Sequence, residues 1–469
     1  MTAIWPLLLG VAALGIVAFC SWRAVASART PQGAIAWVIF LLAAPWFGVP
    51  AYVIFGHHKL RAYTEARRRS RELTRQLAAQ AQDYPPRDDA RQRLIAFARM
   101  GKMPIVGGND AGLLIDGEET FEAIFEAIEG ARRYVCVQFY TIVDDAVGQA
   151  LADRLVAAAE RGVTVRVIYD GVGSYGLSRG YRQRLTDAGI RILDPRAARG
   201  PTSRLQINFR NHRKTVIVDG ETGFMGGLNV SETYLGRNPA YGVWRDTHLR
   251  LRGPIVSQLQ LVFAEDWHWA TGESLADAMG WHPGIDPAGM TGLLVPMGPG
   301  DDMDTGALFF FSAITGARNR VWIASPYFVP DIDTLTALSD AALRGCDVRL
   351  IVPDTVDHYL PWLAAFAFFD EVRRAGVKVH RYQQGFMHQK VVLVDDDIAA
   401  VGTANFDNRS FRLNFETMAV MHDAAFAREV ETMLTADLKE CTLLEQSLAE
   451  QPLPIAIGAP LARLLAPVL

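Results

Sequence analysis

The stretch His212-Arg-Lys214-Thr-Val-Ile-Val-Asp219 decides the fold, because the chain repeats it as His388-Gln-Lys390-Val-Val-Leu-Val-Asp395. An asparagine follows each aspartate at the same distance, Asn229 in the first copy and Asn405 in the second. The chain contains only six lysines and ten histidines, so two chance matches with identical spacing are not a serious explanation. The repeat indicates two related units that carry the same chemical groups.

The spacing also predicts geometry. Residues two apart on an extended strand point to the same side, so the histidine and the lysine of each copy share a face. Asp219 and Asp395 have the opposite parity, and Asp219-Gly220 is a hairpin signal, so we interpret the aspartates as orienting or turn residues. Together, the two copies would place two imidazoles, two ammonium groups and two carboxamides around one small anion.

The similarity extends outward from the motifs. Ala131–Tyr140 resembles Ala317–Phe328, and Glu160–Ile168 resembles Leu343–Ile351. β-branched runs alternate with alanine-rich helical stretches, so each copy is predicted to be an α/β unit on a largely parallel sheet. Two such units predict a pseudo-twofold pair with the active site at their interface.

These groups suit phosphoryl transfer. The reaction chiefly needs positioning and neutralisation of charge on the phosphoryl oxygens, and two lysines with two asparagines supply cationic and amide donors without a metal. The paired histidines, which titrate near neutral pH, can divide the roles of nucleophile and general acid/base. The sequence therefore predicts a catalytic centre with neither metal nor cofactor.

At these residues the chain resembles the phospholipase D superfamily and, within it, the bacterial cardiolipin synthases. The resemblance covers nearly the whole chain. It includes both motifs, the repeat around them, the apolar N-terminus with Gln32–Trp37 and Pro50–Gly56, and the stretch Gly402–Glu416. One departure is Gly226-Gly227, where the superfamily often has Gly followed by Ser or Thr, as at Gly402-Thr403.

The resemblance implies a two-step exchange through a covalent phosphohistidine. His212 would attack the phosphorus of one phosphatidylglycerol while His388 protonates the departing glycerol, although either histidine could be the nucleophile. A second phosphatidylglycerol would then take the phosphatidyl group and leave as cardiolipin. The family also places an acidic residue behind each histidine, and Asp246 and Glu416 occupy matching positions after the two motifs.

Other readings of these residues stay open. An ordinary buried ion pair is the alternative for Asp246 and Glu416, and surface ion pairs are the alternative to recognition of a second phosphate by Arg409 and Arg412. Water could replace the lipid as acceptor, which would make the protein a hydrolase, or another phospholipid could be the donor or acceptor. A nuclease and an inactive membrane scaffold are further alternatives.

The N-terminus is apolar. Residues 1–22 carry no charge, and a second uncharged stretch runs from Thr30 to Gly56. Each is long enough to span a bilayer, so we expect a transmembrane helical hairpin, with a cleaved signal peptide as the alternative for the first stretch. Pro45, Gly48 and Pro50 could instead make the second stretch re-entrant.

Charge is distributed unevenly. Residues 1–75 hold nine Lys and Arg against two Glu, so the rest of the chain holds 38 basic and 49 acidic residues. Such an acidic body argues against nucleic-acid binding. The basic cluster Lys59–Arg75 favours anionic lipid headgroups or is a solvated helix face, and it predicts a multi-pass protein of the bacterial inner membrane with its body in the cytoplasm.

The pattern predicts five regions. They are two membrane segments (1–58), a basic helical linker (59–104), two phospholipase D-like domains (105–290 and 291–450) and an apolar, proline-interrupted tail (451–469). The tail is expected to pack on the body or to rest at the membrane surface. Four cysteines far apart in sequence indicate neither a zinc knuckle nor a disulfide framework.

Overall fold

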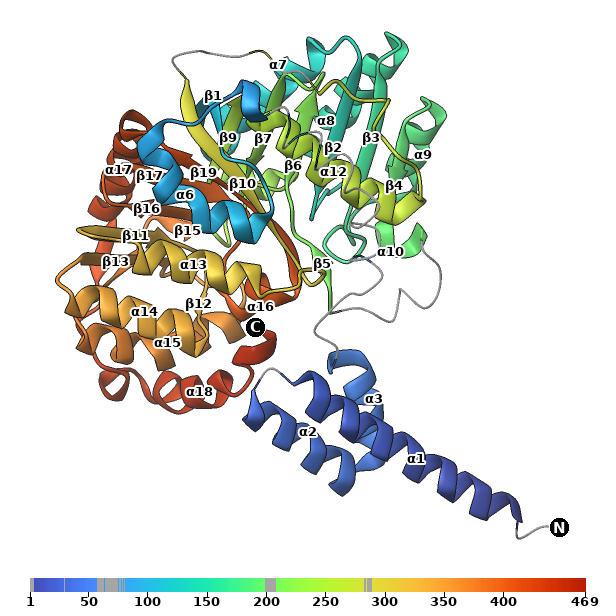
Figure 1. Ribbon diagram of the computed structural model, residues 1–469, viewed down its shortest axis with the longest axis vertical. Helices are drawn as coiled ribbons and strands as arrows, with labels where there is room; N and C mark the ends of the chain where they lie inside the picture. The colour runs from blue at the N-terminus through green and yellow to red at the C-terminus, as the bar shows by residue number, and fades with distance from the viewer. Residues whose placement is uncertain are drawn as a thin grey trace.

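The computed structural model describes residues 4–28, 30–56, 63, 75, 77, 79, 81–198, 208–281, 284 and 289–469. Within these residues, the two predicted units form the body, and three N-terminal helices project from it (Figure 1). Of the predicted basic cluster, only Arg75 falls among the described residues.

One mixed sheet of sixteen described strands runs through both units, fifteen of them in one continuous order and the sixteenth, β5 (Arg210–Asn211), beside β19. From its outer edge to the middle, the first half contributes β4 (Arg191–Leu193), β3 (Thr164–Tyr169), β2 (Tyr134–Phe139), β6 (Thr215–Val218), β7 (Thr222–Gly226), β9 (Thr247–Arg252) and β1 (Val106–Ile115). The second half contributes β10 (Met290–Met297), β19 (Asn414–His422), β17 (Ile398–Gly402), β16 (Val391–Val394), β11 (Arg320–Ala324), β13 (Asp347–Pro353), β14 (Lys378–Tyr382) and the edge strand β20 (Cys441–Leu443).

The predicted pseudo-twofold relation is confirmed by this order. Read from the middle outward, each half repeats the other strand for strand up to the extra edge strand β20, and β1 pairs antiparallel with β10 where the halves meet. The motif strands β6 and β16 therefore occupy equivalent places.

The prediction of a largely parallel sheet is wrong. Within the continuous strand order, the parallel pairs are β2 with β3, β3 with β4, β11 with β13, and β13 with β14. The motif strands β6 and β16 run antiparallel to β7 and β17 because tight hairpins join them at Asp219 and Asp395, which adopt positive φ of 56° and 52°. They also pair antiparallel with β2 and β11. Parallel neighbours would need a long crossover there instead.

Helices cover both faces of the sheet (Figure 1). The first half supplies α7 (Asp116–Glu129), α8 (Ala146–Glu160), α9 (Arg179–Asp187) and α12 (Ile255–Thr271), and the second supplies α13 (Thr305–Thr315), α14 (Ile332–Leu343), α15 (Tyr359–Arg374) and α17 (Ala424–Lys439). Aspartate side chains cap equivalent helices: Asp145 accepts from Gly148 N at the start of α8, and Asp331 accepts from Thr334 N at the start of α14.

The two halves share a hydrophobic core. One buried cluster includes Ile217 and Leu249 of the first half together with Trp322 and Ala419 of the second. It lies under α12 and α17, which contribute Phe263 and Val430. Because this core crosses the pseudo-twofold, the halves are fixed relative to each other by apolar burial as well as by strand pairing.

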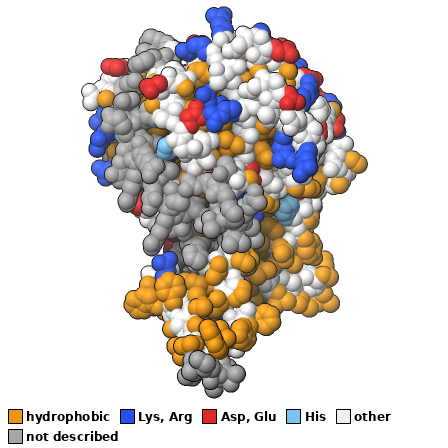
Figure 2. All heavy atoms as spheres, turned by 90° about the vertical axis from the view of Figure 1, so that its right-hand side faces the viewer, with side chains coloured by type: hydrophobic (Ala, Val, Ile, Leu, Met, Phe, Trp, Pro, Cys, Tyr) orange, Lys and Arg blue, Asp and Glu red, His pale blue; other side chains and the backbone are white. Residues whose placement is uncertain are grey.

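The N-terminal helices form a separate packed unit. α1 (Ile4–Ser27) is, among the described residues, the one helix long and apolar enough to cross a membrane, over Leu8–Ser27. The second predicted segment is two short helices, α2 (Pro31–Ala43) and α3 (Pro45–Phe55), because the chain breaks helical geometry at Ala44. Hydrophobic side chains cover the outside of the part that projects from the body (Figure 2).

The C-terminal tail packs on the body. After the short β20 edge, α18 (Leu453–Arg463) buries Ala459 and Ala462 and sets Gly458 against Leu363 of α15. Its opposite face leaves Leu453, Ile457 and Leu461 exposed. The tail therefore combines a packed face with an apolar solvent-facing row.

Candidate active site

Two short strands carry the motif histidines across the pseudo-twofold. β5 (Arg210–Asn211) precedes His212 and pairs with the start of β19 in the second half. β15 (Gly385–Met387) precedes His388 and pairs with β8 (Val243–Arg245) in the first half. The peptide N–H of His212 donates to Phe415 O at 2.9 Å, and that of His388 donates to Arg245 O at 2.7 Å.

This exchange of strands sets which carboxylate faces which ring. Glu416, directly after Phe415, has Oε2 2.9 Å from Nδ1 of His212. Asp246, directly after Arg245, has Oδ2 2.8 Å from Nδ1 of His388. Both carboxylates are fully buried. Each imidazole is therefore held by the opposite half, with its Nδ1 engaged and its Nε2 left for chemistry.

The two motif lysines are buried beside the histidines. Lys214 Nζ donates to His212 O at 2.7 Å and lies 5.5 Å from the centre of the Tyr140 ring. Lys390 Nζ lies 2.8 Å from Nδ1 of His388 and also donates to its carbonyl oxygen. Burial lowers the pKa of Lys214 to about 7 and that of Lys390 to about 8. The site holds two ammonium groups whose charge a bound anion would stabilise.

Burial also lowers the pKa of both imidazoles. For His212, the charge and hydrogen bond of Glu416 oppose this effect. For His388, the charges of Lys390 and Lys214 reinforce it, and the pKa falls well below 6.5. Both rings are thus neutral at neutral pH in the empty site, the form in which a histidine can act as a nucleophile.

Asn229 and Asn405 are buried shortly after β7 and β17, the strands that follow the motif strands β6 and β16. Asn229 Oδ1 accepts from Thr141 N at 3.0 Å, and Nδ2 donates to the Tyr234 hydroxyl at 2.7 Å. Asn405 donates its peptide N–H to Ser410, and its Oδ1 has no hydrogen-bond partner among the described residues. The two carboxamides thus differ in how they are anchored.

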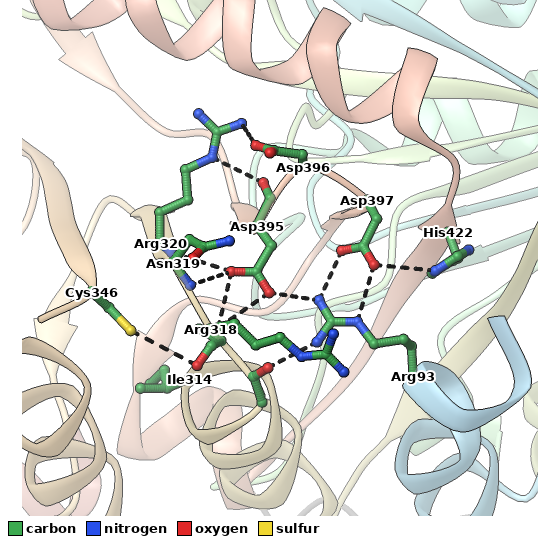
Figure 3. A network of polar contacts seen from close by, with 12 residues as sticks. Arg93, Ile314, Arg318, Asn319, Arg320, Cys346, Asp395, Asp396, Asp397 and His422 are labelled. Carbon is green, nitrogen blue, oxygen red and sulfur yellow. Dashed lines mark hydrogen bonds and ion pairs between the residues drawn. The ribbon is translucent and has the colours of Figure 1, made fainter. Parts of the chain in front are cut away.

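The motif aspartates do not contact the histidines. Asp219 accepts from the peptide N–H groups of Arg132, Arg133 and Tyr134. Asp395 accepts from those of Arg318, Asn319 and Arg320, and it pairs with Arg93 of α6 (Asp88–Gly101) at 2.8 Å (Figure 3). They fix the far ends of β6 and β16, which agrees with a turn role and gives them no contact with the reacting groups.

Gly227 stands where the superfamily often has Ser or Thr, and this difference has a steric reason. A Cβ on Gly227 would lie 1.9 Å from Oδ1 of Asp246. At the equivalent position, the Thr403 hydroxyl accepts from Thr417 N at 2.9 Å, beside the longer Glu416. The first half therefore has a short carboxylate and no side chain at this position, whereas the second has a long carboxylate and a threonine.

Several site residues escaped the sequence analysis. The Tyr140 ring lies edge-on to His212 with 5.0 Å between centroids, and Trp244 lies 5.3 Å from the His388 ring. His248 is buried, with neither ring nitrogen hydrogen-bonded among the described residues. Comparison of the repeats gives no signal for these residues, because Pro326, Asn414 and Met418 occupy the places of Tyr140, Trp244 and His248.

The two arginines singled out from sequence lie in different environments. Arg412 is paired with Asp331 and hydrogen-bonded to Asn408, so its charge is used within the fold. Arg409 donates to the carbonyl oxygen of Asn208 at 2.9 Å. Among the described residues, no group of three or more His, Cys, Asp or Glu is placed to hold a metal ion.

Comparison with known proteins gives separate matches for the N-terminal region and for the two halves of the body. The family model described as "Cardiolipin synthase, PLD-like domain" matches residues 124–267 and 310–438. The chain belongs to this family. A second model, "Phospholipase_D-nuclease N-terminal", matches residues 11–57. The protein is thus an enzyme of the phospholipase D superfamily with an apolar N-terminal region of the kind found beside that domain.

Relatives within the family align along most of their length. The chain is 48% identical to "Cardiolipin synthase A" of Pseudomonas aeruginosa (strain PAO1), covering 92% of this chain and 89% of that one. It is 45% identical to the protein of the same name from Pseudomonas putida (strain W619), covering 97% and 96%. Among solved structures, it is similar in fold to the phosphatidylserine synthase of Haemophilus influenzae, with a TM-score of 0.60, 15% identity, and coverage of 81% and 100%.

Proposed function

We propose that this enzyme condenses two phosphatidylglycerol molecules into cardiolipin and glycerol through a phosphohistidine intermediate. The observation that carries the proposal is the paired centre, in which two neutral imidazoles, each with Nδ1 held by a carboxylate, lie among two buried lysines. The relatives named cardiolipin synthase A support this choice of product.

The proposed first step forms the intermediate. Nε2 of His212 attacks phosphorus, the bond from phosphorus to the glycerol oxygen breaks, and that oxygen takes a proton from His388. His388 must therefore be protonated when substrate is bound. The arriving phosphodiester favours this, because its negative charge offsets the lysine charges that lower the pKa of His388.

The second step releases the product. A hydroxyl of the second phosphatidylglycerol gives its proton to His388 and attacks phosphorus, and the bond between phosphorus and His212 breaks. Lys214, Lys390, Asn229 and Asn405 stabilise the charge on the phosphoryl oxygens, while Glu416 and Asp246 orient the rings. Because the lysines and amides provide this stabilisation, we expect no metal or other cofactor, and activity should survive a chelator.

The apolar surface suits a membrane enzyme. We propose that α1–α3 anchor the protein in the bacterial inner membrane as a multi-pass unit, with the catalytic body on the cytoplasmic side. The basic residues between Lys59 and Arg75 would contact anionic headgroups, and we expect no nucleic-acid partner. We also propose the sequence boundaries given above, with the halves meeting between residues 290 and 291, one residue into β10.

A hydrolase using water as acceptor, or a transferase using another phospholipid, is the alternative function. Full-length protein in phosphatidylglycerol vesicles would be followed by mass spectrometry for wild type, His212→Ala, His388→Ala and, as a matched control, His268→Ala on the last turn of α12. We expect one glycerol per cardiolipin from wild type and control, and no turnover from the other two. Phosphatidic acid in place of cardiolipin would identify a hydrolase.

The same variants identify the nucleophile. In the His388→Ala variant, a phosphatidyl adduct should accumulate on His212 in samples quenched without acid. The bond between phosphorus and His212 still forms slowly in this variant, while release of the phosphatidyl group is blocked. An adduct found instead on His388 of the His212→Ala variant would reverse the two roles.

A further inference from the structure

The C-terminal tail presents a row of large apolar side chains to the solvent. They recur every three or four residues through α18 and the 3₁₀ turn η4 (Ala466–Val468), a spacing that places side chains on one face of a helix. This apolar row consists of Leu453, Ile457, Leu461, Leu464 and Val468, all exposed. Because α18 packs on α15 through its other face, the apolar row contributes little to holding the tail on the body.

The apolar row carries no charge of its own. Arg463 is the one charged residue between Pro452 and Leu469. Its guanidinium is directed toward α15, where it donates to the Ala367 carbonyl oxygen at 3.1 Å and lies 3.4 Å from a carboxylate oxygen of Glu371. The row can therefore enter the boundary between lipid headgroups and acyl chains without taking an ion out of water.

The end of the tail is fixed beside the catalytic centre. The peptide N–H of Arg409, in α16 (Asn408–Arg412), donates to Leu469 O at 2.8 Å. The next residue of α16 is Ser410, whose hydroxyl donates to Oε1 of Glu416 at 3.0 Å. Glu416 in turn faces His212 with its other oxygen. The tail therefore ends on the short helix that helps to hold the orienting carboxylate of His212.

The N-terminal helices reach the body on the same side. Tyr63 is buried against Phe415, which directly precedes Glu416, with 4.5 Å between the ring centroids. The seven residues that lead from Gly56, after α3, to Tyr63 can span at most about 25 Å. In Figure 1, α18 lies at the lower end of the body, and α1–α3 extend beyond that end. The tail and the N-terminal helices thus approach the catalytic centre from one side of the molecule.

We propose that the apolar row rests in the surface of the lipid bilayer and, together with α1–α3, holds the catalytic site at the level of the phospholipid headgroups. This proposal rests on the proposed function, in which α1–α3 are the membrane anchor. The anchor alone is one point of attachment, about which the body could turn. The tail supplies a second point on the same side, and contact with lipid removes its exposed apolar surface from water.

The test maps lipid contact directly. Full-length protein would be placed in vesicles of phosphatidylglycerol and phosphatidylcholine, with a trace of phosphatidylcholine that carries a photoreactive diazirine on its acyl chain. After irradiation, mass spectrometry of peptides reports which segments touch the bilayer, and the same vesicles report cardiolipin formation.

Three proteins would be compared: wild type, the double variant Ile457→Glu/Leu461→Glu, and Leu343→Glu as the matched control. Leu343 is the last residue of α14 and is 75% exposed, compared with 63% for Ile457 and 62% for Leu461, but it lies outside the apolar row. Because all three positions are exposed, the temperature of unfolding should stay at the wild-type value in both variants.

We expect lipid adducts on α1–α3 in all three proteins, and on the tail in wild type and control. The double variant should lower the yield of tail adducts by about tenfold or more, because it replaces two apolar side chains by carboxylates. Its kcat/KM for phosphatidylglycerol should fall by about threefold or more, since the site is no longer held beside its substrate, while the control should match wild type.

Adducts on α1–α3 without adducts on the tail of wild type would overturn the tail contact. So would a dimer, measured by light scattering, that the double variant dissociates, because the apolar row would then cover a second copy of the chain. Full activity of the double variant without tail adducts would refute the orienting role. A wild type without adducts on α1–α3 would instead overturn the proposed anchor.

Discussion

Glu416 Oε2 lies 2.9 Å from Nδ1 of His212, although the two residues are 204 positions apart and belong to different halves. The contact exists because β5 leaves its own half and pairs with the start of β19. Asp246 and His388 repeat the relationship in the opposite direction. Each half therefore contributes a histidine that only the other half can orient.

Removing one carboxylate should affect the histidine of the opposite half. For Glu416→Gln we expect kcat to fall by about two to four orders of magnitude, as when an orienting carboxylate is removed from other catalytic histidines. The pKa of His212 should fall further, since Glu416 raises it. Steady-state kinetics and NMR of labelled histidine would measure both effects. A pKa change at His388 alone would contradict the crossed pairing.

Gly227 should be essential for activity, whereas its counterpart Thr403 should not. Gly227→Ala places a Cβ 1.9 Å from the Asp246 carboxylate, so it should displace the group that holds His388 and lower kcat by at least about a hundredfold. Thr403→Ala is the matched control, because it removes the bond to Thr417 N without a clash and should cost about 1 kcal/mol of stability. Equal activity of the two variants would refute this reading.

Activity and stability should respond to pH in opposite directions. The lysines must be protonated to bind phosphate, so KM for phosphatidylglycerol should rise by about tenfold per pH unit above pH 7, where Lys214 loses its proton, and by about a hundredfold per unit above pH 8, where Lys390 does so as well. Their folded-state pKa values lie below 10.5, so the unfolded chain binds more protons between about pH 7 and 10.5, and their contribution to the free energy of unfolding rises across that window.

Lys214→Arg tests this origin of the pH dependence, because Lys214 is the first of the two lysines to lose its proton. The guanidinium keeps its charge, so KM should stay nearly constant to about pH 8, where Lys390 deprotonates, instead of rising from about pH 7, although kcat should fall because the geometry changes. Kinetics from pH 6.5 to 9.5, with thermal unfolding over the same range, would check both statements. A KM independent of pH in wild type would show that the lysines keep their protons throughout.

The buried His248 should be replaceable. Neither of its ring nitrogens is hydrogen-bonded among the described residues, burial lowers its pKa to about 3, and Met418 occupies the equivalent strand position in the other half. His248→Met should raise the free energy of unfolding by about 1 kcal/mol and leave kcat within about threefold of wild type. A large loss of activity would instead indicate that this imidazole takes part in the reaction.

The sequence predicted the parts of the structure that depend on local pattern. Repeated motifs predicted two equivalent α/β halves, and strand parity placed His212 with Lys214. The exchange of β5 and β15 between halves could not be predicted, because it depends on pairing between residues about two hundred positions apart. The antiparallel motif strands were foreseeable, since Asp219-Gly220 already signalled a hairpin.

The sequence predicted which residues lie together in the site more completely than it predicted which of them contact each other. His212, Lys214, His388 and Lys390 lie together as the repeat implied. Asp246 and Glu416 lie behind the histidines, but position in sequence gave no information on which ring each would hold.

The crossed carboxylates have a consequence for synthesis of the chain. A ribosome that has completed the first half has made His212 but not Glu416, and nearly the whole second half must follow before that ring is oriented. We therefore expect the nascent protein to be inactive until Glu416 has been added and the second half has folded. Catalytic power is acquired only when the polypeptide is almost finished.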